Sequence, residues 1–95
     1  MNNETILEEA QRITDGDRDG DYGTAEDNFG KIAAYWNVYM EHNDLDIGRI
    51  LEPKHIAMMM VLMKIAREDF KHKRDNLTDA AGYLRCLAKI QREEG

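Results

Sequence analysis

A long apolar run near the middle of the chain constrains the fold more than any other feature. Every residue from Ile56 to Ala66 except Lys64 is apolar. The run is too long for a typical strand and contains no turn signal, so it predicts a helix from Pro53 to Phe70. Proline suits a first helical turn, where the backbone N–H groups have no intrahelical partner. Because this helix is apolar nearly all round, we expect a central element covered on several sides.

Length and charge limit the classes of function open to the chain. Its 95 residues predict one domain, and a monomer of this size buries only about 60–65% of its extended-chain surface. We therefore expect a homodimer or larger assembly, in which subunits cover the rest of the apolar helix. The net charge of −6 argues against a general nucleic-acid binder, which needs a basic face. The apolar run is also shorter than the ~20 residues that cross a membrane, so no membrane partner is expected.

The single cysteine and the N-terminal segment indicate a compartment. Cys86 is the only cysteine, so no intrachain disulfide can form, as is usual for proteins of the reducing cytoplasm. The first residues lack the charged and then apolar pattern of a signal peptide. The sequence therefore predicts a cytoplasmic protein.

Three further helices are expected around the apolar one. The first is predicted at residues 3–14. The second, at residues 24–42, opens with Thr24 and has an acidic residue three positions later, as in a capping box. The last, at residues 76–92, has Asn76 as its expected cap. Strand alternation, repeats and linkers are absent from the sequence, so the predicted fold class is all-α, a four-helix bundle in a single domain that includes the whole chain.

Charged residues gather where the last two predicted helices meet. A short polar turn at residues 71–75 makes these helices an antiparallel hairpin. Counting outward from the turn puts Arg67 opposite Asp79, and Lys64 opposite Gly82 and Tyr83. A cation on a largely apolar helix needs a carboxylate or an anionic ligand, so Lys64 indicates either an ion pair or an anion site at this position.

Two interpretations of this charged cluster stay open. In the first, Lys64 and Arg67 form a buried ion-pair network with Asp75 and Asp79 that fixes the register of the two helices. In the second, Lys64 and Arg67 hold phosphate in a polar pocket. The acidic residues Glu68, Asp75 and Asp79 then bind a divalent ion, since Mg²⁺ favours one or two carboxylates together with phosphate oxygens.

An ordered set of residues between positions 13 and 90 resembles a small family of phage- and prophage-encoded helical proteins without a settled function. The residues that carry the resemblance are Asp21, Tyr22, Gly23, Asn28, Phe29, Ile32, Ala33, Trp36, Met60, Lys64, Arg67, Arg74, Asp75, Asp79, Gly82 and Tyr83. That family in turn resembles a distant branch of the all-α nucleoside triphosphate pyrophosphohydrolases, the MazG-like and dimeric dUTPase group.

The second resemblance implies an activity and a cofactor. Those enzymes hydrolyse (d)NTPs to the monophosphate and pyrophosphate with Mg²⁺, usually as dimers or tetramers. They carry Glu-x-x-Glu on one helix and Glu-x-x-Asp on the next, whereas this chain reads Lys64-x-x-Arg67 and Asn76-x-x-Asp79. The inverted charge on the first helix indicates an inactive relative, a binder that holds phosphate directly, or a rearranged site.

The leading functional hypothesis is therefore a phage-type nucleotide-binding protein, either a Mg-dependent (d)NTP pyrophosphohydrolase or an inactive relative. In this hypothesis Asn28 or Tyr83 contacts the nucleotide. The rival hypothesis is a non-enzymatic, oligomeric interaction or assembly protein whose charged cluster is purely structural.

An acidic loop between the first two helices supports a third hypothesis. The pattern Asp-x-Asp-x-Asp-Gly-x5-Glu matches the EF-hand signature, with ligand oxygens at positions one, three and five, a turn glycine and a bidentate glutamate at twelve. The candidate calcium ligands are Asp15, Asp17, Asp19, Asp21 and Glu26. The alternative is a solvated loop whose aspartates and glycines make turns and helix ends. The sequence contains no second loop with which an EF-hand would pair.

Overall fold

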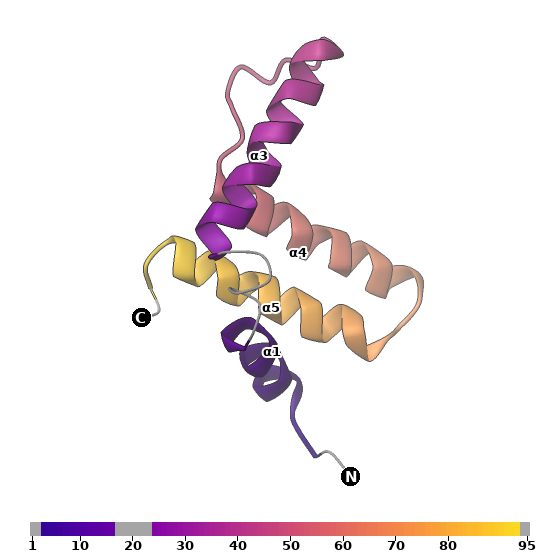
Figure 1. The fold of residues 1–95 in the computed structure, drawn as a ribbon. Helices are drawn as coiled ribbons and strands as arrows, with labels where there is room; N and C mark the ends of the chain where they lie inside the picture. Colours follow the sequence, from indigo (N-terminus) through magenta and orange to yellow (C-terminus); the bar gives the residue numbers. More distant parts are fainter. Residues whose placement is uncertain (1–2, 17–23, 94–95) are drawn as a thin grey trace.

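The computed structural model describes residues 3–16 and 24–93, and all regular structure within them is helical (Figure 1). The helices are α1 (Ile6–Asp15), α3 (Ala25–His42), α4 (Pro53–Phe70) and α5 (Arg74–Ile90). The predicted all-α class is confirmed, and α4 has the predicted bounds. Within the described part of the chain, no helix is both long and apolar enough to cross a membrane.

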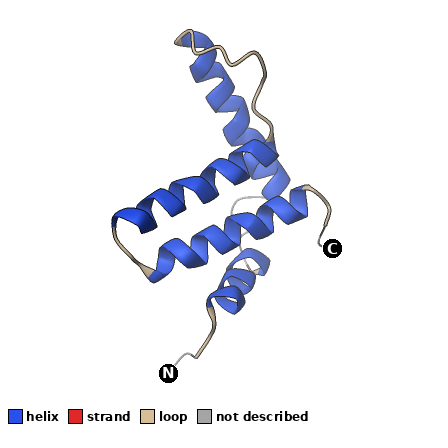
Figure 2. Ribbon diagram, turned by 180° about the vertical axis from the view of Figure 1, so that it is seen from behind, coloured by secondary structure: helices blue, strands red, loops and turns tan. Residues whose placement is uncertain are grey.

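The other helices are assembled on α5. It contacts α1, α3 and α4, whereas α1 contacts α5 alone among the described helices. In both ribbon views α4 and α5 lie side by side as a hairpin, and α1 lies on the far side of α5 from α4 (Figures 1 and 2). α3 rises steeply from the hairpin, and its C-terminal half extends beyond the other helices. As predicted, α4 is covered on more than one side, by α3 and α5, but α5 rather than α4 contacts all the other described helices. The prediction that other subunits cover the rest of α4 stays a prediction.

Side-chain caps set the starts of the first two helices. The Thr5 hydroxyl accepts the Glu8 backbone N–H at 3.1 Å, and the Glu8 carboxylate accepts the Thr5 N–H at 2.9 Å. This capping box fixes the start of α1 three residues later than predicted. The Thr24 hydroxyl accepts the Asp27 N–H at 3.1 Å, so the predicted start of α3 is confirmed.

The helix α5 begins earlier than predicted, because a carboxylate of α4 accepts hydrogen bonds from its N-terminal end. The Glu68 carboxylate accepts the backbone N–H of Lys73 at 3.1 Å and the side-chain amide of Asn76 at 3.2 Å. The helix therefore begins at Arg74, two residues before the predicted cap. Asn76 lies buried within the first turn, where its amide also donates to the Lys71 carbonyl at 3.3 Å.

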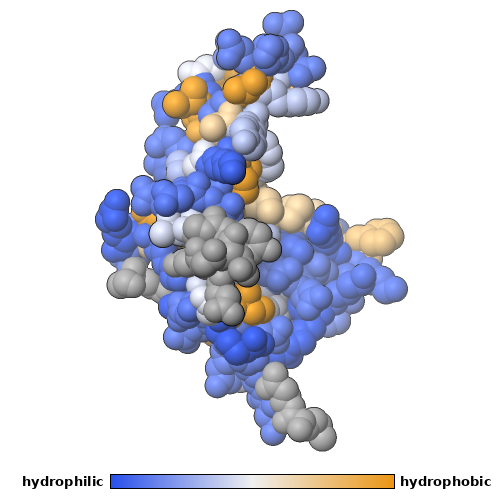
Figure 3. All heavy atoms as spheres, viewed as in Figure 1, coloured by the Kyte–Doolittle hydropathy of each residue, from blue (hydrophilic) through white to orange (hydrophobic). Residues whose placement is uncertain are grey.

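The fully buried apolar core is small. Its described members, each at most 5% exposed, are Ala10, Phe29, Ala33, Ile56, Ala57, Val61 and Cys86. The Phe29 ring packs against Tyr83 with 6.2 Å between centroids. Because three of the seven are alanines, this core leaves much apolar surface of α3 and α4 uncovered. Figure 3 shows hydrophobic atoms along α3 and in the corner where it rises from α4.

Candidate functional site

A cavity of about 660 Å³ lies at the end of the α4–α5 hairpin. Its lining residues are Met63, Lys64, Ala66, Arg67 and Phe70 from α4, Lys71 and Lys73 from the turn, and Asp75, Asn76 and Asp79 from α5. Four of these side chains are basic and two are acidic, on a chain whose net charge is −6. The cavity brings together both predicted phosphate ligands and two of the three predicted metal ligands.

One ion pair ties the two walls of the cavity together. The Lys64 ammonium lies 2.8 Å from the Asp79 carboxylate, with side chains 12% and 40% exposed. The prediction that a carboxylate of the neighbouring helix meets Lys64 is confirmed. The register differs by about one turn, since Asp79 rather than Gly82 or Tyr83 lies opposite Lys64. The early start of α5 accounts for this shift.

The other three cations of the cavity are unpaired within the described part of the chain. The side chains of Arg67, Lys71 and Lys73 make no hydrogen bond or ion pair with another described residue. Like charges held around one cavity repel one another, and an anion placed among them lowers that repulsion. The N-terminus of α5 lies at the same end of the hairpin and adds a positive dipole end.

Glu68, the third predicted metal ligand, does not join the other two. Its carboxylate is bonded to His72 Nδ1 at 2.5 Å, to the Lys73 N–H and to the Asn76 amide, and it does not line the cavity. These three bonds hold the pKa of Glu68 below its usual range, and the bond from His72 has the largest effect. Among the described residues no three His, Cys, Asp or Glu side chains gather as a metal site. Glu68 is a structural residue of the turn.

The two predicted nucleotide contacts lie elsewhere. Asn28 sits in the first turn of α3, and Tyr83 lines a separate cavity of about 90 Å³ between α1 and α5. The sequence reasoning instead missed Phe70, which is 91% exposed, together with Lys71 and Lys73. The sequence does carry a signal for them, since the predicted polar turn reads Lys-His-Lys-Arg and is strongly basic.

The proposed calcium loop is described only at its two ends. Asp17, Asp19 and Asp21 lie outside the described residues. Asp15 accepts hydrogen bonds from Arg85 and from Lys89, the latter at 3.2 Å. These bonds hold the pKa of Asp15 below its usual range, and the bond from Arg85 has the largest effect. The Glu26 carboxylate lies 3.6 Å from the Arg92 guanidinium.

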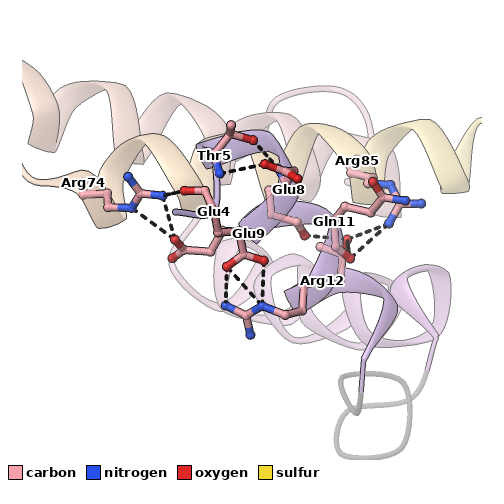
Figure 4. A network of polar contacts seen from close by, with 10 residues as sticks. Glu4, Thr5, Glu8, Glu9, Gln11, Arg12, Arg74 and Arg85 are labelled. Atoms are coloured by element: carbon pink, nitrogen blue, oxygen red, sulfur yellow. Dashed lines mark hydrogen bonds and ion pairs between the residues drawn. The ribbon is translucent and has the colours of Figure 1, made fainter. Parts of the chain in front are cut away.

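The charges between α1 and α5 form a paired network (Figure 4). Arg74 lies 3.0 Å from the Glu9 carboxylate and donates to the Glu4 carbonyl at 2.9 Å. The Glu4 carboxylate in turn pairs with Arg12 at 2.9 Å, which raises the pKa of Arg12. These contacts hold the short α1 helix on α5, and each cation has an acceptor.

Known proteins place this chain in a family. A family model described as a domain of unknown function (DUF6378) matches residues 5–91. The chain belongs to the DUF6378 family. It is 42% identical over 91 residues to the Gene 55 protein of Mycobacterium phage D29, covering 95% of this chain and 56% of that protein. It is 39% identical over 92 residues to the Gene 55 protein of Mycobacterium phage L5, covering 95% and 54%.

This DUF6378 chain thus spans about half the length of the curated relatives it matches. No solved structure matches it. The resemblance to phage-encoded helical proteins without a settled function is confirmed. The further resemblance to NTP pyrophosphohydrolases stays a prediction.

The chemistry available to the DUF6378 cavity is anion binding. The planar guanidinium of Arg67 can donate two parallel hydrogen bonds to a phosphate, and the ammonium groups of Lys71 and Lys73 supply further positive charge. Asp75 and Asp79 lie four residues apart on one face of α5. Serine, threonine and cysteine are absent from the lining residues, so the described cavity offers no such nucleophile.

Proposed function

We propose that this DUF6378 protein binds a nucleoside triphosphate in the cavity at the end of the α4–α5 hairpin. The observation that carries the proposal is the excess of basic side chains around one cavity of an acidic chain, four against two. The cavity volume of about 660 Å³ falls within the roughly 300–1,000 Å³ that is usual for small-molecule sites. A compact, multiply charged anion matches both its size and its charge.

The lining residues suggest where each part of the nucleotide lies. Arg67, Lys71 and Lys73 are free to contact the phosphates, because no described carboxylate holds them. Phe70 lines the cavity and is 91% exposed as a residue, and an exposed aromatic ring can stack on a base of any identity. The Lys64–Asp79 pair keeps the two helices in register beneath the ligand.

The two carboxylates of the cavity indicate how a metal ion would bind there. Asp75 and Asp79 are the two acidic groups of the cavity, and Mg²⁺ is commonly held by one or two carboxylates together with phosphate oxygens. The pair therefore fits an ion that arrives with the nucleotide better than an ion bound alone. The resembled hydrolases use four acidic positions, so we propose binding as the function and place any hydrolysis to monophosphate and pyrophosphate at this same cavity.

Calorimetric titration with each NTP and dNTP, with and without Mg²⁺, tests the proposal. The variant Arg67→Ala/Lys71→Ala/Lys73→Ala should bind the best nucleotide at least ~100-fold more weakly. Each lost hydrogen bond to a charged group costs about 1.5–3 kcal/mol. The control Lys31→Ala/Arg49→Ala/Lys54→Ala removes the same charge from residues outside the cavity lining and should keep its affinity. A folded wild-type protein that binds no nucleotide refutes the proposal.

A second candidate, the interaction or assembly protein, is favoured by a different observation. Large apolar side chains on α3 and α4, among them Tyr35, Val38 and Leu62, are more than half exposed. None of them lines the charged cavity. Nucleotide binding and self-assembly can therefore be tested separately.

A further inference from the structure

Two helices contain stretches without a charged residue on any face. In α3 the stretch covers residues 32–40, and in α4 it covers residues 56–63. A helix that faces water on one side normally carries polar residues on that side, whereas a helix that is apolar all round is covered all round. We therefore expect other elements to pack against each of these two stretches on all sides.

The described chain covers only one side of each stretch. α3 buries Phe29 and Ala33, and α4 buries Ile56, Ala57 and Val61. The uncovered side chains follow helical spacing and form a stripe on each helix. We name them together the outer stripe: Tyr35, Val38 and Tyr39 on α3, and Met58, Leu62 and Ile65 on α4. Exposure in the outer stripe runs from 43% at Met58 to 65% at Tyr35.

The surplus of exposed surface has the size of a subunit interface. The accessible surface is 6998 Å², whereas a folded monomer of 11.0 kDa is expected to expose about 5,600 Å². A stable interface of standard size takes about 800 Å² from each partner. The surplus is larger than this, and the apolar core of the described residues is small. A partner that covers the outer stripe would supply the missing core.

We propose that the outer stripe is the interface between two copies of this chain, related by a twofold axis. In such an interface the same patch lies on both sides, so a charged residue near the axis would oppose its own like charge. The outer stripe contains no charged residue, and two chains of net charge −6 can meet there without opposing charges. A partner recognised through opposite charge would need ionic groups in the patch, and the patch has none.

The shape of the molecule agrees with a second copy. The C-terminal half of α3 extends beyond the α4–α5 hairpin in both ribbon views (Figures 1 and 2). Hydrophobic atoms lie along α3 and in the corner between α3 and α4 (Figure 3). In the proposed dimer the stripes of one copy cover those of the other. No member of the outer stripe lines the charged cavity, so the inference does not depend on nucleotide binding.

Sedimentation equilibrium of the purified chain tests the proposal. The expected mass is that of two 11.0-kDa chains at micromolar concentration. The variant Leu62→Lys places a charge in the stripe and should sediment as a monomer. Its control, Ile47→Lys, changes a side chain of similar exposure, 58% against 56%, outside the stripe and should remain a dimer. A wild-type monomer at these concentrations overturns the proposal and leaves the stripe to another partner.

Cysteine cross-linking keeps the proposal testable if Leu62→Lys does not fold. Cys86 is buried, at 2% exposure, so a newly introduced exposed cysteine is the reactive one. We expect at least one of Met58→Cys, Leu62→Cys and Ile65→Cys to form a covalent dimer on mild oxidation, and Ile47→Cys to stay single. Cross-linking at position 47 with none at the three stripe positions contradicts the interface.

Discussion

The two sides of α5 use charge in opposite ways. On the α1 side, Arg74 meets Glu9, and both Arg85 and Lys89 meet Asp15. On the α4 side, at the end of the hairpin, one cation of the cavity is paired with a carboxylate and three are not. In the α1 contact the described chain supplies a carboxylate for each of these cations. In the cavity three exposed cations have no carboxylate partner among the described residues, so they are available to an anionic ligand.

The ion pairs on the two sides of α5 also differ in burial. The Arg74–Glu9 pair of the α1 side has a cation that is 50% exposed, whereas Lys64 in the cavity is 12% exposed. Exposed pairs contribute about 0–1 kcal/mol, since water and salt screen them. A pair with one buried partner is costly to break, because the remaining charge keeps the cost of leaving water. Disrupting each side in turn therefore tests which contacts hold the fold.

The largest effect on stability is expected at the Lys64–Asp79 pair. Asp79→Asn should lower the free energy of unfolding by about 2 kcal/mol, because the Lys64 ammonium, only 12% exposed, loses its partner. Glu9→Gln, the matched change on the α1 side, leaves the half-exposed Arg74 unpaired and should cost less than about 1 kcal/mol. Urea denaturation of both variants gives the comparison. Equal losses would show that the hairpin pair is no more important than the α1 network.

Two buried threonines of the α1–α5 contact should respond in opposite directions. The Thr14 hydroxyl donates to the Ala10 carbonyl at 2.8 Å and accepts from Arg85 at 2.9 Å, so Thr14→Val should cost about 1–2 kcal/mol. The Thr78 hydroxyl is buried without a partner in the described chain, so Thr78→Val should gain up to ~1 kcal/mol. Thermal unfolding measures both. A loss at Thr78 would indicate a water bonded to it in the adjoining cavity of about 90 Å³.

A smaller gain is expected at Gly82, which faces α1. A Cβ added there would meet a methyl carbon of Thr14 at 3.5 Å, an ordinary contact. Gly82→Ala should therefore raise the free energy of unfolding by about 0.5–1 kcal/mol through helix propensity. Gly48→Ala is the contrasting variant, because Gly48 has a φ of +74° and a side chain there is strained. Destabilisation by Gly82→Ala would mean that α1 packs more tightly on α5 than this spacing indicates.

The sequence predicted what local patterns determine. The apolar run gave α4 its bounds, Thr24 gave the start of α3, and the isolated cation Lys64 gave the contact between helices. Each of these depends on a residue and its near neighbours in the chain. The start of α5 was not predicted, because it depends on a residue of another helix. Glu68 of α4 accepts hydrogen bonds from the Lys73 backbone N–H and the Asn76 side chain.

The site was predicted in part for a similar reason. A carboxylate near two cations reads as a metal ligand in sequence, but Glu68 is used by the turn and its neighbour His72. The composition of α4 indicated that other elements pack against it on several sides. It did not indicate that α5 also packs against α1 and α3. Phe70, Lys71 and Lys73 were not predicted, because a polar turn between helices is normally solvated and only the fold shows that this one lines a cavity.

Acid should weaken the α1 side of α5 through Asp15. Its bonds to Arg85 and Lys89 lower its folded pKa, whereas in the unfolded chain it titrates near 3.9. The stability that this group contributes is therefore present above about pH 4–5 and lost as the pH falls through the lowered folded pKa. Asp15→Asn should flatten the dependence of stability on pH in this window. Asp69→Asn removes an exposed carboxylate with no ion pair to another described residue and should leave the slope unchanged. Because the Asp15 contacts are exposed, 1 M salt should reduce the difference in the free energy of unfolding between wild type and Asp15→Asn. A difference that salt does not reduce would show that the α1 contact is held by packing rather than by charge.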